Sequence, residues 1–378
     1  MKIIVLGAGL VGGPMAADLA AEPGFEIGVA DIDPAALARL KNKADARTIE
    51  ADLSDPAAVR EAVRDFDLVL SAVPGFLGFE TLRAVIEAEK DVVDISFFPE
   101  DPFALDALAR EKSVTAVVDC GVAPGMSNIL VGRAQSRLEA VASVLIYVGG
   151  LPEVREWPYD YKAGFSPADV IEEYTRPARY IQNGAVVVRP ALSEPEFLDF
   201  PGMGTLEAFN TDGLRTLMRT IPAPDMKEKT LRYPGHIEKM VVLRETGFFS
   251  QEEIEVNGSW VRPRDVTAKL LFPKWKMGPD DRDITIMRVI VEGTTGGRRR
   301  CFTSDLLDRF DPKTGVHSMA RTTGYTATMA VRMLARGLYP RKGIIAPEFI
   351  GRETECVEFI LDGLERRGVV YQETIRDL

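Results

Sequence analysis

Cysteine and histidine are scarce in this sequence, which has three cysteines and two histidines among 378 residues. The cysteines, Cys120, Cys301 and Cys356, are odd in number and widely spaced. This argues against a disulfide framework and favours a reducing compartment. Cysteine and histidine also form no cluster with the spacing of a zinc site, so we expect no bound metal.

Long apolar runs and a basic stripe are also missing. No segment approaches the roughly 18 uninterrupted apolar residues of a membrane helix. Residues 1–9 lack the zones of a signal peptide and begin like a strand. The formal net charge of −11 makes the chain a poor partner for nucleic acid or anionic lipid. We therefore expect a cytoplasmic protein with neither nucleic-acid nor membrane partners.

Apolar segments alternate with segments of helical period in the first 120 residues. Six strands joined by five helical crossovers predict a parallel sheet covered on both faces. The expected fold class is α/β, with a Rossmann-type doubly wound sheet over residues 1–128. The predicted strands are residues 2–7, 26–31, 46–53, 66–74, 91–96 and 114–119.

The texture changes after residue 128, where longer strand-like runs are separated by loops rich in proline and glycine. This pattern predicts a mixed, mostly antiparallel α+β domain over residues 129–317. Two helices interrupt it, near 211–220 and 235–246. From residue 318 the helical period returns, and we expect residues 318–378 to pack back on the first domain. The predicted strands are residues 142–151, 183–190, 265–272, 283–293 and 298–305.

A G-x-G-x-x-G motif follows the first predicted strand and opens a helix, which is the context that a dinucleotide-binding fingerprint requires. Gly7 permits the tight turn, Gly9 lets a pyrophosphate approach the backbone, and Gly12 lets helix and strand pack closely. Leu10 and Val11 lie between the glycines, beside the helix N-terminus that would bind the phosphates. These five residues are predicted to bind the cofactor.

Other cofactor contacts are expected at the ends of later strands. Asp31 can accept both ribose hydroxyls of NAD and would repel the 2′-phosphate of NADP, so NAD is favoured over NADP. Asp52 could reach the adenine edge, although a loop-turn role explains it equally well. Ala72, Val73 and Pro74 would let a flat nicotinamide or ribose lie against the backbone, or they simply pack well there.

Two acidic residues end apolar strands where an α/β sheet holds its ligand. These are Asp94 and Asp119, and the alternative role for each is local hydrogen bonding to loop amides. Cys120, which follows Asp119, is more typical of a small buried hydrophobic residue than of a nucleophile.

Five further stretches give the chain a family resemblance. In order they contain "APG", "GGLP", "NTDGL" and "RYPGH", followed by a threonine-rich helix. With the glycine motif, they resemble the saccharopine dehydrogenase superfamily over nearly the whole length, and within it most closely the NAD-dependent lysine 6-dehydrogenase branch. The resemblance implies a Rossmann domain and a substrate domain whose sheet makes a homodimer. The stretches are residues 119–132, 147–153, 207–217, 230–240 and 318–334.

The same resemblance implies oxidation at a carbon that bears an amine. Lysine would pass hydride from Cε to the nicotinamide, and water would then release ammonia from the imine. The amine has a pKa of roughly 10.4, so a base must deprotonate it. His236, in "RYPGH", is the first candidate, with a core or helix-capping role as the alternative. Asp94 and Asp119 could hold the ammonium, activate water or act as the base.

The carboxylate end of an amino-acid substrate needs a cation or amides. Arg232 and Arg244 flank the His236 segment, although Arg244 also suits an exposed helix face. Asn210 and Thr211 could bind the amino-acid end, and equally begin a helix. Thr322 is expected near the nicotinamide.

Two other functions remain open. NADP-linked imine reductases, such as saccharopine reductase and carboxynorspermidine dehydrogenase, share several of these stretches. A non-catalytic dinucleotide sensor would need the glycine motif but not the polar residues of the second domain.

Overall fold

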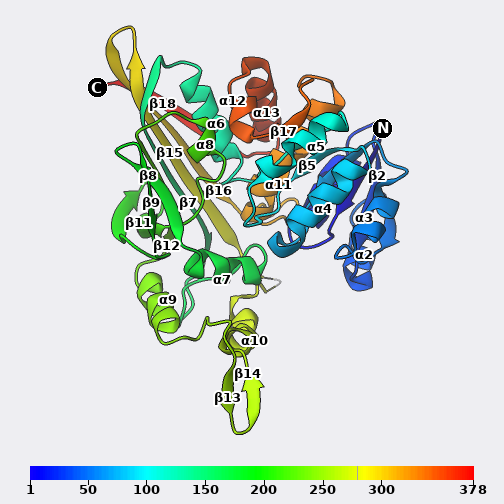
Figure 1. Cartoon of the computed structure of the whole chain (residues 1–378), viewed down its shortest axis with the longest axis horizontal. Coiled ribbons are helices and arrows are strands. Elements are labelled where there is room, and N and C mark those ends of the chain that lie inside the picture. Colours follow the sequence, from blue (N-terminus) through cyan, green and yellow to red (C-terminus); the bar gives the residue numbers. More distant parts are fainter. Residues whose placement is uncertain (279) are drawn as a thin grey trace. The chain divides into compact units, whose positions relative to one another are not determined.

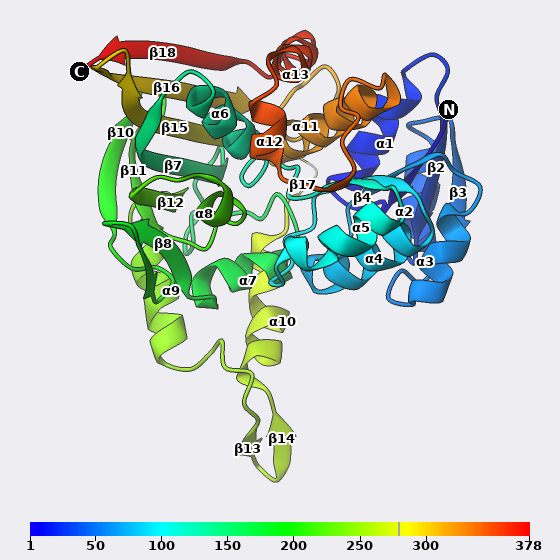
Figure 2. The ribbon, with the colours of Figure 1, turned by 45° about the horizontal axis from the view of Figure 1, so that its top comes forward.

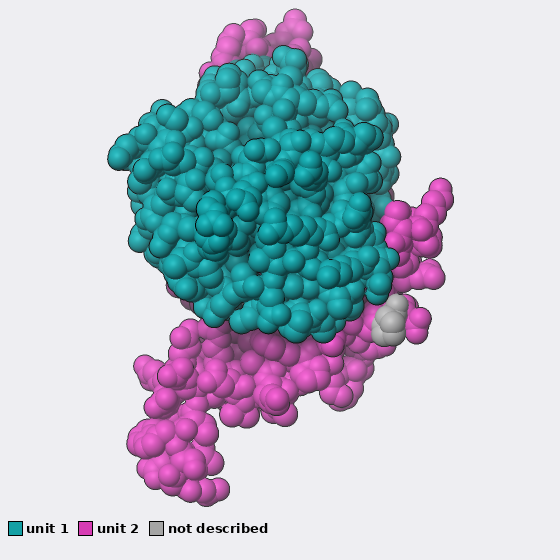
Figure 3. All heavy atoms as spheres, turned by 90° about the vertical axis from the view of Figure 1, so that its right-hand side faces the viewer, with its two compact units in different colours: residues 1–138, 319–371 teal, residues 139–318, 372–378 magenta. Residues whose placement is uncertain are grey.

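The computed structural model describes residues 1–278 and 280–378, and the chain forms two compact units (Figure 3). Unit 1 comprises residues 1–138 and 319–371, and unit 2 comprises residues 139–318 and 372–378. Residues 319–371 therefore return to the unit that contains the N-terminus. Among the described residues, no helix has both the length and the apolar character needed to cross a membrane.

Unit 1 is built on a seven-stranded parallel sheet (Figure 1). The strand order, β17-β6-β5-β4-β1-β2-β3, reverses direction between β1 and β4, where doubly wound sheets bind ligands. The predicted Rossmann sheet is confirmed. The strands are β1 (Lys2–Leu6), β2 (Glu26–Asp31), β3 (Ala46–Glu50), β4 (Leu68–Ser71), β5 (Asp91–Asp94), β6 (Thr115–Val117) and β17 (Gly343–Ile345).

Helices cover this sheet, so β4 is buried along its whole length and β1 along all but its first residue. Asp33 and Asp55 each cap a helix with the side chain, and a proline follows each of them in the first turn. The helices are α1 (Gly12–Ala20), α2 (Pro34–Lys41), α3 (Pro56–Val63), α4 (Gly75–Glu87), η1 (Pro102–Leu105), α5 (Asp106–Glu111), α6 (Met126–Gln135), α11 (Ser318–Ala335), α12 (Pro347–Gly351) and α13 (Thr354–Arg366).

Unit 2 contains a nine-stranded mixed sheet whose main path is β10-β11-β12-β7-β15-β16-β18 (Figure 2). Neighbouring strands are mostly antiparallel, while β12 and β7 run parallel, so the predicted mixed sheet is confirmed. The strands are β7 (Ala140–Pro152), β8 (Ala178–Gln182), β9 (Ala185–Arg189), β10 (Glu196–Phe200), β11 (Gly204–Asn210), β12 (Asp225–Arg232), β15 (Asp283–Thr295), β16 (Arg298–Arg309) and β18 (Tyr371–Asp377).

The helices of unit 2 are not part of this sheet. A separate two-stranded hairpin connects the third of these helices to the fourth. The helices are α7 (Pro167–Thr175), α8 (Leu217–Thr220), α9 (His236–Glu245) and α10 (Pro263–Trp275), and the hairpin strands are β13 (Ile254–Val256) and β14 (Ser259–Val261).

Three predictions about secondary structure are wrong in part. Residues 265–272 form part of helix α10 rather than a strand, because Pro263 begins the helix and Thr267, Leu271 and Trp275 bury one side of it. The helix expected near 211–220 shrinks to α8. The end of the segment expected to be helical is instead strand β18, which pairs along the edge of β16.

Candidate functional site

The glycine turn of unit 1 is shaped by close backbone approaches. Gly7 has φ +104°, and a Cβ on it would lie 2.8 Å from the carbonyl oxygen of Ala72. A Cβ on Gly12 would lie 2.0 Å from the carbonyl oxygen of Gly7, so neither position accepts a side chain. A Cβ on Gly9 would have no other atom within 4 Å, which leaves room for a ligand against the backbone.

The first turn of α1 is suited to an anion. Its N-cap residue, Val11, makes no side-chain capping bond, although Pro14 has no N–H and the N–H groups of Gly13 and Met15 donate to the carbonyl oxygens of Gly9 and Val11. Leu10, in the turn, is exposed. The residues at this turn therefore fit the pyrophosphate of a dinucleotide.

Asp31 ends β2 and is tied to the glycine turn. One carboxylate oxygen accepts a 2.6 Å hydrogen bond from the N–H of Ala8, and the other accepts a 2.8 Å bond from the N–H of Asp33. Asp33 caps α2 itself through Ala35, so Asp31 is not the capping residue. Each carboxylate oxygen keeps further lone pairs for ribose hydroxyls. Ile32, which follows, is exposed, and an apolar side chain there was not predicted as part of the site.

The structure places the remaining cofactor candidates on two loops. Asp52 is exposed and accepts hydrogen bonds from the N–H and hydroxyl of Ser54, which lower its pKa; this is the loop-turn role left open by the sequence. Ala72 donates its N–H to Leu6 in β1, Val73 is buried, and Pro74 precedes α4. Sequence reasoning missed the next apolar side chain, Phe76, which is exposed at the start of α4.

An acid pair lies at the carboxyl ends of β5 and β6. Asp94 is fully buried, lies opposite Ser71 in the parallel ladder, and accepts bonds from the N–H and hydroxyl of Ser96. Burial raises the pKa of Asp94 to about 7, and the charge of Asp119 adds to the rise. The hydroxyls of Ser71 and Ser96 act in the opposite direction and lower the pKa. Asp119 is also buried and has φ +49°.

Cys120 belongs to the same cluster but is not suited to nucleophilic chemistry. Its side chain is fully buried, and burial raises the pKa of its thiol, as do the charges of Asp94 and Asp119. The neutral thiol is a poor nucleophile. This agrees with the expected role of a small buried residue.

The loop after Cys120 packs tightly against α11 within unit 1. Gly125 has φ +135°, and a Cβ there would lie 2.0 Å from the carbonyl oxygen of Gly121. A Cβ on Gly121 would lie 3.2 Å from the methyl group of Thr323. Thr322, the predicted substrate contact, is fully buried, whereas Thr323 is half-buried beside this loop.

His236 begins α9 in unit 2 and is fully buried. Its Nδ1 lies 2.8 Å from the carbonyl oxygen of Tyr159, and its Nε2 lies 2.9 Å from the hydroxyl of Tyr174. The carbonyl can only accept, so Nδ1 donates and the tyrosine hydroxyl donates to Nε2. Burial lowers the pKa of His236 to about 3. This environment favours the alternative that the sequence left open, a core histidine.

The predicted substrate arginines both have protein partners. Arg232 is fully buried, donates to Glu173 at 2.6 Å and to the Tyr174 hydroxyl at 3.3 Å, and lies 4.5 Å from the ring centroid of Tyr161. Arg244 donates to the carbonyl oxygen of Ala191 and to the adjacent Glu245. Each guanidinium group is therefore already paired with a carboxylate of the protein.

A buried polar group surrounds the start of the "NTDGL" stretch. The Thr211 hydroxyl contacts the carboxyl of Glu228 and lies 2.9 Å from the Thr230 hydroxyl. Asn210 donates to Ser193, while its own Oδ1 is buried and has no hydrogen-bond partner among the described residues. Burial raises the pKa of Glu228 to about 8. Glu228 was not predicted, because its burial depends on strands distant in sequence.

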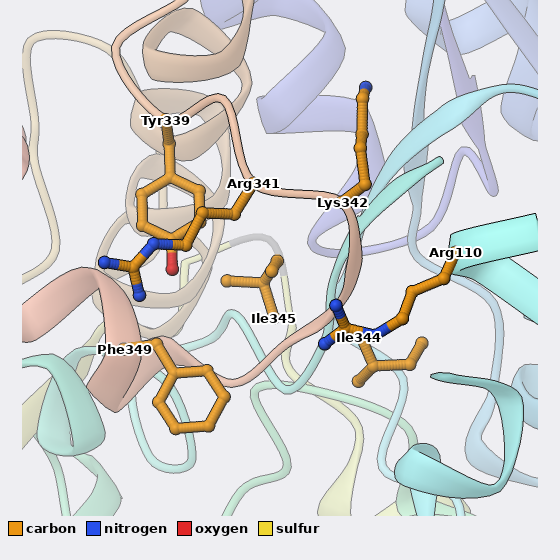
Figure 4. Close-up of a pocket in the computed structure, with 7 residues that line it drawn as sticks. All are labelled: Arg110, Tyr339, Arg341, Lys342, Ile344, Ile345 and Phe349. Atoms are coloured by element: carbon orange, nitrogen blue, oxygen red, sulfur yellow. The ribbon is translucent and has the colours of Figure 1, made fainter. Parts of the chain in front are cut away.

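A pocket of about 320 Å³ lies elsewhere in unit 1 (Figure 4). Its three cations already have carboxylate partners: Arg110 pairs with Asp106, Arg341 with Glu353 and Lys342 with Asp91. No predicted site residue is among its described lining residues, so it is separate from the glycine turn and the acid pair. The remaining lining residues are Tyr339, Ile344, Ile345 and Phe349.

Comparison with models of known protein families identifies the family of this chain. Residues 3–117 match the model of the saccharopine dehydrogenase NADP binding domain, and residues 121–369 match the saccharopine dehydrogenase C-terminal domain. The chain belongs to the saccharopine dehydrogenase family. The predicted superfamily is therefore confirmed, together with a nicotinamide-dinucleotide binding domain.

Within residues 1–278 and 280–378, no group of histidine, cysteine and carboxylate side chains could hold a metal ion.

The chain resembles both longer and comparable members of this family. It is 25% identical to the mitochondrial alpha-aminoadipic semialdehyde synthase of Rattus norvegicus over 99% of its own length, but spans only 48% of that protein. It is 23% identical to a saccharopine dehydrogenase [NADP(+), L-glutamate-forming] of Saccharomyces cerevisiae, covering 92% of this chain and 93% of the yeast protein. The chain thus spans about half the length of the aminoadipic semialdehyde synthases of Rattus norvegicus, Mus musculus and Bos taurus.

Solved structures share the fold of this saccharopine dehydrogenase family member. The apo saccharopine dehydrogenase (L-Glu forming) of Saccharomyces cerevisiae superposes with a TM-score of 0.81 at 20% identity, covering 99% of each chain. A homospermidine synthase of Legionella pneumophila in complex with NAD gives a TM-score of 0.69 at 10% identity, covering 100% of this chain and 92% of the other. The lysine 6-dehydrogenase branch stays a prediction.

Proposed function

We propose that this chain is an NAD(P)-dependent dehydrogenase that oxidises a carbon bearing an amine in a lysine-related amino acid. The observation that carries the proposal is the buried Asp94–Asp119 pair, which ends strands of the same sheet whose first turn has the glycine fingerprint. The family assignment supports the same chemistry, because relatives are named saccharopine dehydrogenases.

The glycine turn supplies the binding site for the coenzyme. Gly9 leaves the backbone open to the pyrophosphate, and the N-terminus of α1 provides the positive end of the helix dipole. When bound, the nicotinamide ring serves as the hydride acceptor. Exposed Leu10, Ile32 and Phe76 offer apolar surface to the flat parts of the coenzyme.

The acid pair would handle the proton of the substrate amine. An amine with a pKa of roughly 10.4 arrives protonated and has no lone pair to expel a hydride from its carbon. A carboxylate with a pKa of about 7 can accept that proton near neutral pH, so Asp94 is the proposed base. Asp119 holds the ammonium group until Asp94 takes its proton, and Asp119, which stays ionised, can later accept a proton from the water that attacks the imine.

The predicted residues of unit 2 receive separate roles. Asn210 has a buried acceptor oxygen that lacks a described partner, so it can bind the ammonium or amide hydrogens of an amino-acid end. Thr211 orients that segment through Glu228. Arg232 and His236 are positioning residues that hold the segment "RYPGH" in the core, and Arg244 fixes α9 to Ala191.

NAD is the proposed coenzyme, with lysine as substrate and its ε-amine as the group removed. Asp31 is held by two backbone N–H groups at the position where a carboxylate repels a 2′-phosphate. The first basic residue after it, Arg39, lies 3.5 Å from the carboxylate of Asp33. This supports NAD even though several relatives are named as NADP(+) enzymes.

The second candidate is an NADP-linked enzyme that forms or cleaves saccharopine or a polyamine adduct, which the names of the relatives favour. One assay separates the two. The purified chain is mixed with NAD or NADP and with lysine, saccharopine or a polyamine, and reduced nicotinamide is followed by its absorbance. We expect turnover with NAD and lysine. Turnover confined to saccharopine with NADP would establish the second candidate instead.

A further inference from the structure

The pocket of unit 1 lies at one edge of the parallel sheet, where β17 is the outermost strand (Figure 4). Its walls come from Arg110 of α5, from residues 339–345, which lie between α11 and α12 and include β17, and from Phe349 of α12. Its volume of about 320 Å³ is within the range of small-molecule sites, roughly 300–1,000 Å³. None of these residues takes part in the proposed dehydrogenase chemistry.

Tyr339 supplies a buried hydroxyl to this pocket. Only 3% of the residue is exposed, and its hydroxyl oxygen makes no hydrogen bond within the described residues. Burial raises the pKa of Tyr339 to about 12, so the hydroxyl keeps its proton and can donate it. A buried polar group without a partner costs free energy, and native structures rarely keep one. The group that would satisfy this hydroxyl is therefore a hydrogen-bond acceptor.

Arg341 lies beside this hydroxyl (Figure 4). Its guanidinium carbon is 5.7 Å from the ring centroid of Tyr339, and its charge opposes the effect of burial on the pKa of the hydroxyl. A guanidinium has five N–H donors and no acceptor, so it cannot receive the tyrosine proton. Tyr339 and Arg341 thus offer donors to a common partner. An oxyanion can accept from both of them at once.

The ion pairs around the pocket leave Arg341 able to bind such a group. Arg341 contacts Glu353 through one nitrogen, Nη2, at 2.6 Å. The side chains of the two residues are 62% and 41% exposed, and a pair at such a surface adds little stability. The Arg341 side chain can therefore move to admit an oxyanion next to the Tyr339 hydroxyl. Lys342 contacts both oxygens of Asp91 and points away from the other lining side chains (Figure 4).

Apolar side chains form the rest of the wall. Ile344, Ile345 and Phe349 line the pocket together with the ring of Tyr339. Phosphate or acetate would gain little from these side chains, whereas an apolar body attached to a carboxylate would be removed from water against them. The lining therefore favours an amphipathic acid over a small inorganic anion.

We propose that this pocket binds a small carboxylic acid that has an apolar body, such as an aryl-substituted or branched aliphatic carboxylate. The carboxylate accepts hydrogen bonds from the Tyr339 hydroxyl and the Arg341 guanidinium, and the apolar body lies against the isoleucine and phenylalanine side chains. The site is separate from the glycine turn and the acid pair, and the proposal is independent of the proposed dehydrogenase activity.

Isothermal titration calorimetry of the full chain with 3-phenylpropanoate tests the proposal. We expect saturable binding of one molecule per chain. Two analogues should each bind at least tenfold more weakly: 3-phenylpropanamide, which lacks the charge, and acetate, which lacks the apolar body. Absence of saturable binding would overturn the proposal. Inorganic phosphate or acetate that binds as tightly as 3-phenylpropanoate would overturn the assignment to an amphipathic acid.

Substitutions test whether the acid binds in this pocket. Tyr339→Phe keeps the ring and removes the hydroxyl, and Arg341→Gln removes the charge, so each should raise the dissociation constant at least tenfold. Arg60→Gln is the matched control, because Arg60 is also an exposed arginine paired with one glutamate, Glu87, elsewhere in unit 1. It should bind 3-phenylpropanoate normally. Unchanged affinity in Tyr339→Phe or Arg341→Gln would place the ligand elsewhere and refute the site.

Thermal unfolding separates ligand binding from a structural role of the hydroxyl. Because the hydroxyl has no partner within the described residues, Tyr339→Phe should not lower Tm in the absence of ligand. Saturating 3-phenylpropanoate should raise Tm of the unsubstituted chain and raise that of Tyr339→Phe by less. A large fall in Tm on Tyr339→Phe without ligand would show that the fold itself satisfies the hydroxyl, which contradicts the proposal.

Discussion

The N–H of Cys120 donates a 2.9 Å hydrogen bond to the carbonyl oxygen of Asp94. This bond joins the end of β5 to the segment after β6, so the carboxylates of Asp94 and Asp119 share one edge of the sheet. Asp94 is in turn opposite Ser71, and the adjacent Ala72 approaches Gly7 closely. The acid pair and the glycine turn thus lie at the carboxyl ends of four neighbouring strands, β6, β5, β4 and β1.

Replacement of Asp94 tests the proposed base. Asp94→Asn keeps the side-chain shape and removes the group that accepts the amine proton, so kcat should fall by about 10²–10⁴-fold. The pKa of Asp94 is raised to about 7, so the unsubstituted enzyme should gain activity as pH rises through that value. The variant should lose this limb of the pH–rate profile.

The control for this change lies on the same strand. Asp91→Asn, at the other end of β5, retains an acceptor for the N–H of Thr115 and should keep most of the activity. Equal loss of kcat in the two variants would point to a folding effect rather than to a base.

Replacement of Asp31 tests the preference for NAD. Asp31→Asn removes the negative charge that would oppose a 2′-phosphate while an amide oxygen can still accept from the backbone. We expect the ratio of kcat/KM for NADP to that for NAD to rise at least tenfold. Asp33→Asn should leave the ratio unchanged, because asparagine caps a helix about as well as aspartate. A chain that already prefers NADP before substitution would refute the assignment.

Replacement of Gly12 tests whether the turn binds the dinucleotide. A Cβ at this position would lie 2.0 Å from the carbonyl oxygen of Gly7, so Gly12→Ala must displace the turn. Calorimetric titration should show loss of NAD binding by tenfold or more. Gly13→Ala, where the nearest atom is an ordinary 3.6 Å away, should bind NAD normally and serves as the neighbouring control. Unchanged affinity in folded Gly12→Ala would remove the turn from the binding site.

The parallel sheet was accessible from sequence because its strands are short apolar runs broken by helix caps. The three-residue strand β17 was too short to give such a pattern. The Asn257–Gly258 pair signals a hairpin turn, but the flanking strands, of three residues each, are too short for a convincing alternation. Residues 265–272 satisfy both strand and helix composition, and burial of Leu271 and Trp275 decided for the helix.

Site residues could be predicted from the sequence where they lie at the ends of predicted strands. Asp94 and Asp119 could be placed at one edge because parallel strands end together. The partners of His236 could not be foreseen, since Tyr159 and Tyr174 come from segments distant in sequence. The burial of Glu228 could not be foreseen either, because its strand, β12, pairs with β7, which is distant in sequence.

Glu228 gives a prediction about stability that is independent of catalysis. Burial raises its pKa from 4.5 to about 8 in the folded chain, so the folded state retains a proton that the unfolded state has lost over that interval. Folding stability should therefore decrease as pH rises from about 4.5 to about 8, and become independent of this group outside the interval. One proton contributes at most about 1.4 kcal/mol per pH unit. Glu228→Gln is neutral at every pH and should flatten this slope in chemical denaturation.

Glu365→Gln provides the comparison for that experiment, because Glu365 is exposed on the surface of unit 1 and exchanges the same two side chains. The buried Asp94 contributes a slope of the same sign in every variant, so the difference between Glu228→Gln and the unsubstituted chain isolates Glu228. Equal pH slopes in the unsubstituted chain and both variants would show that Glu228 is ionised in the fold. The Thr211 contact would then join a charged carboxylate to the hydroxyl, and the raised pKa would have to be abandoned.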